Sequence, residues 1–86
     1  MNPKVLDVEP TDDYQLIVTF VNGEKKKMDV SPYLEKGVFR ELKKINYFKR
    51  VCVSFGSVAW PNEQDLSHDT LYLCGKNLTG IIDRAP

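Results

Sequence analysis

The sequence has few of the side chains that usually perform chemistry. Its 86 residues include one histidine and two cysteines, Cys52 and Cys74, which form no close C-x-x-C pair. A zinc site needs about four ligands, more than these three residues supply. Two isolated cysteines make no disulfide framework either, and they are more typical of small, half-buried apolar residues. We therefore expect no metal, no cofactor and no disulfide.

Glycine and long apolar runs are also scarce. The five glycines occur singly, so no glycine-rich loop is present to hold a phosphate. The apolar runs are only a few residues long, whereas a membrane-spanning helix needs roughly 20. Residues 1–4 lack the apolar core of a secretion signal. We expect a cytoplasmic protein that does not associate with membranes.

What is present indicates one small folded domain. Hydrophobic residues make up 42% of the chain and aromatic residues 10%, values that are ordinary for a globular protein and argue against disorder. No linker, repeat or low-complexity segment divides the chain. We expect a single domain over residues 1–75 and a loosely ordered tail over residues 76–86.

Alternating apolar residues predict strands in two parts of the chain. Residues 5–8 form a short first strand, and residues 14–21 and 24–30 form a hairpin. A second hairpin over residues 51–55 and 58–60 turns at Gly56-Ser57. The fold class is therefore α+β, in which one small antiparallel sheet combines the two hairpins with the short first strand.

The register of the first hairpin follows from its apolar pattern. A two-residue loop would pair Leu16 with Asp29, which sets a core residue against a charge. A three-residue loop with Gly23 in the left-handed region pairs Leu16 with Met28 instead. We expect this second register, which leaves the stem of Lys26 at the rim of the core.

Helical spacing predicts one main amphipathic helix over residues 38–49, packed across the sheet, together with short helical turns. Ser31-Pro32 is expected to begin a brief helix, with the serine hydroxyl as its N-cap, that ends at Gly37. Ser67 is expected to cap another short helix that stops near Gly75. The residues at helical spacing are Val38, Phe39, Leu42, Ile45 and Phe48.

The basic residues gather in the middle of a chain whose formal net charge is zero. Residues 25–50 carry nine basic against three acidic side chains, and both flanking segments are acidic. Such a segment could bind nucleic acid. No aromatic interleaving or known motif accompanies it, so a solvated helix face is the preferred interpretation. The candidate nucleic-acid contacts are Lys25, Lys26, Lys27, Arg40, Lys43 and Lys44.

The segment over residues 58–72 holds the only tryptophan and the only histidine. His68 has Ser67 beside it, but adjacent helical residues point in different directions, so a nucleophile–base pair is not expected. We expect no catalytic residue here.

The turn at residues 60–65 is a candidate for partner binding. Tryptophan is enriched in interface hot spots, and a proline beside it fixes the backbone. We expect Trp60 to pack partly on the sheet, with one edge exposed beside Pro61 and Asn62. Asp65 would hold the turn or the helix start. The alternative, in which the whole segment serves only folding, stays open and is slightly favoured.

The motif V-x-W-P-N-x-x-D-L over residues 58–66 is the most specific in the chain. Through this motif the chain resembles domain-of-unknown-function family 2442, a family of small bacterial proteins whose members often carry glycine at the position of Glu63. The other shared patterns are V-x-x-V-x-P near the start, Y-x-L-x-V-x-F-x-N-G-E over residues 14–24, residues 30–34, Phe39-x-x-Leu42 with Phe48, and Leu71-Tyr72.

The resemblance implies a compact α+β domain of hairpins and short helices and transfers no catalytic residue. Some members are joined to a helix-turn-helix domain, and some neighbour toxin–antitoxin-like genes. Our first hypothesis is therefore a non-enzymatic interaction or regulatory module with a protein partner, such as the antitoxin-like half of a two-protein system. The alternatives are a nucleic-acid-binding protein and, third, a small enzyme. The chain is expected to be a monomer or a homodimer.

Overall fold

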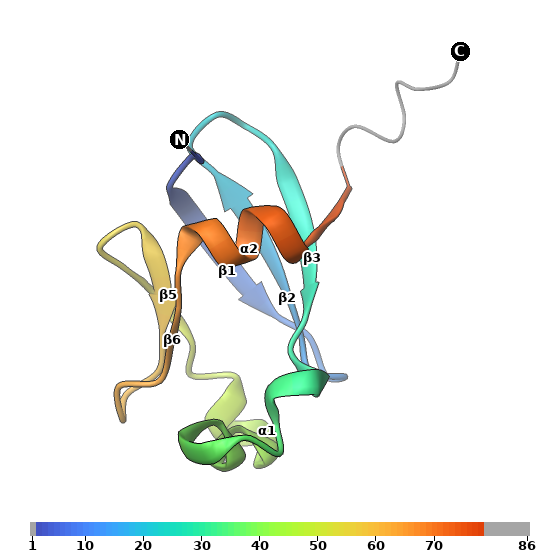
Figure 1. Ribbon diagram of the computed structural model, residues 1–86, viewed down its shortest axis with the longest axis vertical. Helices are drawn as coiled ribbons and strands as arrows, with labels where there is room; N and C mark the ends of the chain where they lie inside the picture. Colours follow the sequence, from blue (N-terminus) through green and yellow to red (C-terminus); the bar gives the residue numbers. More distant parts are fainter. Residues whose placement is uncertain (1, 79–86) are drawn as a thin grey trace.

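The computed structural model describes residues 2–78 and has two antiparallel sheets joined by short helices (Figure 1). This confirms a mixed α+β fold, although the sequence predicted a single sheet. The first sheet contains, in spatial order, β1 (Val5–Pro10), β2 (Gln15–Phe20), β3 (Lys25–Asp29) and β7 (Lys76–Asn77). The second contains β4 (Cys52–Ser54), β5 (Ser57–Ala59) and β6 (Asp65–Leu66).

The β2–β3 hairpin has the predicted register. Leu16 lies opposite Met28, and the Phe20 amide donates to the Glu24 carbonyl at 2.8 Å, which closes a three-residue loop. Gly23 has φ +91°, in the left-handed region where glycine is unstrained. The apolar pattern was sufficient here, because the other register would bury charged side chains.

A single core lies between the two sheets and the helices. Its members are buried apolar side chains from all parts of the chain. They are Val5, Leu16, Val18, Phe20, Met28, Val30, Leu42, Phe48, Val58, Trp60, Leu66 and Leu71.

The helix that crosses the first sheet is α2 (His68–Cys74), drawn in orange in Figure 1. Leu71 on its inner face is fully buried, and the Tyr72 ring packs edge-on against Phe20 with centroids 5.2 Å apart. The Ser67 side chain caps this helix by accepting from the Thr70 amide, as predicted. The prediction that residues 38–49 fill this place was wrong.

Residues 38–49 form two short helices, the 3₁₀ helix η2 (Gly37–Lys43) and α1 (Ile45–Phe48). The chain is extended at Lys44, with φ −79° and ψ 111°, between them. The Tyr14 hydroxyl donates to the Lys43 carbonyl, which a continuous α-helix would use for the amide four residues on. Leu42 and Phe48 are buried on either side of the break, whereas Val38 is 68% exposed.

Two other turns differ from the prediction. The 3₁₀ helix η1 (Ser31–Tyr33) begins at Ser31-Pro32, but the Asp29 carboxylate accepts from the Ser31 amide and the serine hydroxyl makes no cap. Gly37, with φ +45°, begins η2 instead of ending a helix. The second hairpin turns at Phe55-Gly56, one residue earlier than expected.

Strand β7 extends the ordered domain past Gly75. Lys76 and Asn77 pair with Lys27 and Lys26 of β3, although the sequence assigned both to the tail. The rest of the predicted tail, residues 79–86, lies outside the described residues. Within residues 2–78, no helix has the length and apolar character needed to cross a membrane.

Candidate interaction surface

The turn between β5 and β6 is a closed three-residue loop over residues 61–63. The Trp60 amide donates to the Gln64 carbonyl at 2.9 Å, and the Glu63 amide donates to the Trp60 carbonyl at 3.0 Å. Glu63 has φ +73°, a conformation that glycine adopts without strain and other residues seldom do. Glu63 therefore has a left-handed backbone conformation that glycine would adopt more easily.

Trp60 is a core residue. Its side chain is only 3% exposed, and its indole N–H donates to the Phe48 carbonyl at 2.8 Å. The expectation that Trp60 offers an edge to a partner is therefore corrected. The two-residue strand β6 contributes few side chains to the core. The large indole of Trp60 fills the space beside α1 instead.

Asn62 and Gln64 join the turn to η2 and α1. The Asn62 side-chain amide lies 2.8 and 2.9 Å from the two carboxylate oxygens of Glu41. Gln64, 3% exposed, donates to the Val38 carbonyl and to Glu41. It also accepts from the Tyr47 hydroxyl at 2.7 Å. These bonds satisfy a buried amide, as stability requires.

The same bonds act on the acidity of Glu41. Hydrogen bonds from Asn62 first, and then from Gln64, hold the pKa of the Glu41 carboxyl below its usual value, because they stabilise its charged form. A second such pair joins α2 to the β2–β3 turn, where the Tyr72 hydroxyl donates to Glu24 at 2.5 Å. That bond lowers the pKa of Glu24 and raises the pKa of Tyr72.

Of the predicted partner-binding residues, Pro61, Asn62 and Asp65 are exposed. The Asn62 amide is already held by Glu41. Asp65 lies in β6 opposite Ala59, where no described residue donates to its carboxylate, and Ser67 caps the helix in its place. The sequence did not identify Gln64, although its position two residues before buried Leu66 puts both on one strand face.

The candidate nucleic-acid contacts lie on two separate parts of the molecule, the start of β3 and the η2–α1 segment beyond the end of that strand (Figure 1). Lys26 is engaged by α2, because its ammonium donates to the Tyr72 carbonyl at 2.9 Å and lies over the Tyr72 ring. Lys43 pairs with Glu35 at 2.7 Å. The chain therefore presents no continuous row formed by all six predicted residues.

The groups near His68 do not assemble into a catalytic arrangement. The Ser67 hydroxyl donates to the Thr70 hydroxyl and accepts from the Thr70 backbone amide. The His68 imidazole lies 3.5 Å from the Asp69 carboxylate. Across residues 2–78, no group of three or more histidine, cysteine, aspartate and glutamate side chains is arranged to hold a metal ion.

Phe55 is the most unusual surface residue among those described. It is 100% exposed and has φ +48°, and Gly56 after it has φ +77°. Positive φ at both central positions defines a type I′ turn, for which Asn-Gly is preferred over a bulky aromatic residue. The Phe55-Gly56 pair in a tight hairpin is the sequence signal for this turn. It was missed because the turn was expected one residue later, at Gly56-Ser57.

Lys4 and Val5 contact Gly56 in the Phe55 turn. The Val5 amide donates to the Gly56 carbonyl at 2.8 Å. The stem of Lys4 packs so closely on Gly56 that an added Cβ would lie 2.8 Å from it. Together with its φ of +77°, this contact favours glycine at position 56, next to the exposed Phe55.

These features define a small α+β domain with a fully exposed aromatic residue at one hairpin tip. The chain belongs to the family described as Protein of unknown function (DUF2442), whose model matches residues 5–76. This confirms the resemblance seen in the sequence. No curated protein matches the chain significantly. No solved structure matches it significantly either.

Proposed function

We propose that this protein is a non-enzymatic interaction module that binds a protein partner through the Phe55 turn. The supporting observation is Phe55 itself, fully exposed in a strained left-handed conformation. Such a conformation costs of order 1–3 kcal/mol. Asparagine at this position would relieve the strain and remove the exposed ring, so folding alone gives no reason for phenylalanine.

The contacts made by Gly56 in this turn support the same proposal. Binding is opposed by the entropy lost when side chains and loops become ordered. Because Val5 and Lys4 already hold Gly56, the loss at the turn is small. An aromatic anchor on a fixed backbone is typical of an interface hot spot. In its more specific form, the proposal makes this chain the antitoxin-like or regulatory half of a two-protein bacterial system, as the family resemblance suggests.

The test compares Phe55→Asn with the wild-type chain for stability and for binding. The partner is first co-purified with tagged full-length protein and identified, and its affinity is then measured with purified components. We expect the substitution to raise the stability of the turn while lowering partner affinity at least about tenfold, as at a hot spot. Leu73→Gln removes another large exposed apolar side chain, 72% exposed, on α2 and is the matched control.

Two outcomes would contradict the proposal. One is equal loss of affinity in Phe55→Asn and Leu73→Gln, because binding would then not depend on the turn. The other is a principal ligand that is nucleic acid, recognised by an affinity that falls steeply as salt is raised.

A further inference from the structure

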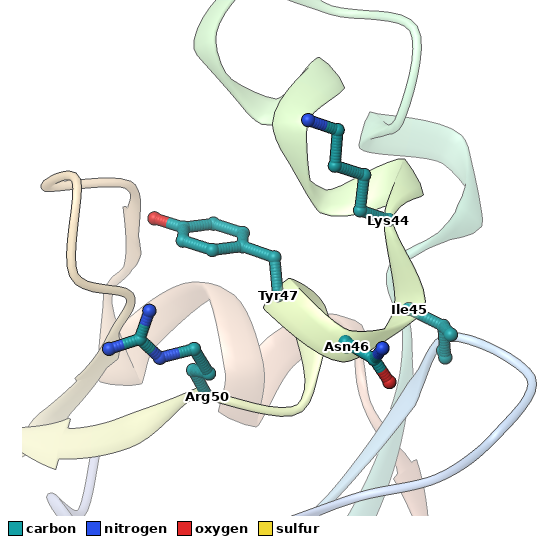
Figure 2. Close-up of a pocket in the computed structure, with 5 residues that line it drawn as sticks. All are labelled: Lys44, Ile45, Asn46, Tyr47 and Arg50. Atoms are coloured by element: carbon teal, nitrogen blue, oxygen red, sulfur yellow. The ribbon is translucent and has the colours of Figure 1, made fainter.

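A hollow of about 530 Å³ lies beside α1, which comes just before β4 in the chain, whereas Phe55 lies in the turn that follows β4. It is lined by the short segment that runs through α1, and Figure 2 shows the Tyr47 ring between the Lys44 and Arg50 side chains. Its lining residues are Lys44, Ile45, Asn46, Tyr47 and Arg50. The hollow therefore combines an apolar surface with two cationic side chains.

Acidic groups engage Lys44 and Arg50 less closely than the lysines beside them, although the charge of Lys44 helps to lower the pKa of the Glu41 carboxyl. Their neighbours in sequence are neutralised, because Lys43 pairs with Glu35 and Lys49 pairs with Asp12. Among the described residues, no carboxylate forms an ion pair with Lys44 or Arg50. Two positive charges of this basic segment, neither of them in an ion pair with a described residue, therefore lie at one apolar hollow.

The aromatic wall of the hollow is held in place. The Tyr47 hydroxyl donates to the Gln64 side chain at 2.7 Å and accepts from the backbone N–H of Asn62 at 2.8 Å. Phe48, the next residue, is fully buried and ties α1 to the core. A ligand would therefore meet a largely preformed surface, which reduces the entropy lost on binding.

We propose that this hollow binds an acidic segment of a partner protein. Its carboxylates meet Lys44 and Arg50, and an adjacent aliphatic side chain covers Tyr47. Guanidinium groups suit carboxylates because they can donate two parallel hydrogen bonds. A nucleic-acid strand fits less well, because it needs a track of cations along its phosphates, and Glu35 and Asp12 interrupt that track. This inference rests on the proposed function only in that it needs a protein partner, and it adds a contact site separate from the Phe55 turn.

The test uses a synthetic peptide with the core Leu-Glu-Glu-Leu, flanked by glycine and serine, and a matched peptide with glutamine in place of glutamate. Each is titrated into full-length wild-type protein and followed by the NMR signals of backbone amides. We expect the acidic peptide to shift the signals of residues 44–50 and the glutamine peptide to bind much more weakly. We expect Arg50→Glu to lower the affinity about tenfold, because a reversed charge replaces attraction with repulsion.

Arg40→Glu makes the same charge change on η2, outside the hollow, and should retain most of the affinity. The inference is wrong if the acidic peptide leaves the signals of residues 44–50 unmoved, or if both arginine variants weaken binding equally. It is also wrong if a single-stranded oligonucleotide shifts the same signals with higher affinity than the peptide. These titrations do not involve Phe55, so failure at the hollow is distinguishable from failure of the proposed function.

Discussion

The indole N–H of Trp60 donates to the backbone carbonyl of Phe48 at 2.8 Å, and the two rings pack with centroids 6.0 Å apart. This contact ties the second sheet to α1, next to the polar bonds that Asn62 and Gln64 make with Glu41. Apolar packing and hydrogen bonds therefore both hold the turn after Trp60 against η2 and α1.

Gln64 should be important for stability even though it lies in a turn. Gln64→Ala leaves the buried partners of its amide without hydrogen bonds, and we expect a loss of about 1–3 kcal/mol in the free energy of unfolding. Chemical denaturation measures this. Asp65→Ala, at the exposed neighbouring position, should change little, and equal effects of the two substitutions would contradict the bracing role of Gln64.

Leu42 should be essential to the core despite the break at Lys44. It is fully buried, so Leu42→Ala should cost about 2–5 kcal/mol through lost burial and the cavity it leaves. Val38→Ala, at an exposed position of the same helix, is the control for helix propensity. A loss below about half a kilocalorie per mole for Leu42→Ala would rule out this packing.

Glu63 should be a site of removable strain. Because its φ is +73°, Glu63→Gly relieves a cost of about 1 kcal/mol or more, partly offset by the greater chain entropy of glycine. We expect a net gain of about 0.5–1 kcal/mol in unfolding free energy. Glu63→Ala keeps the strained backbone and should give no gain. If alanine stabilised the protein as much as glycine, the effect would come from the lost charge.

Acid should weaken the Glu41 bonds. Hydrogen bonds from Asn62 and Gln64 lower the pKa of Glu41 in the folded protein below its usual value. Its stabilisation is therefore present above the usual pKa and is lost as pH falls through the lowered pKa. Glu41→Gln should therefore show a smaller fall in stability between neutral and acidic pH. Asn62→Ala removes the main cause of the shift and should move this part of the pH dependence toward the usual value. Superimposable wild-type and Glu41→Gln profiles would contradict the assignment.

The sequence by itself determined the elements whose pattern is local. Period-two alternation fixed β2 and the pairing of Leu16 with Met28, because a slip of one residue would turn the apolar face outward. The hydroxyl of Ser67 similarly determined the start of α2, because a side-chain cap acts within a few residues.

Only the tertiary structure decided what residues 37–48 and the Trp60 turn become. Helical spacing favoured one continuous helix, but the Tyr14 hydroxyl takes the Lys43 carbonyl and Trp60 takes the Phe48 carbonyl. Glu41 likewise meets Asn62 across 21 positions of sequence. These bonds join groups that no local pattern relates, and buried polar groups must find whichever partner the packing supplies. For this reason the sequence identified the turn as important, while the packed structure assigned Trp60 to the core and left Phe55 exposed.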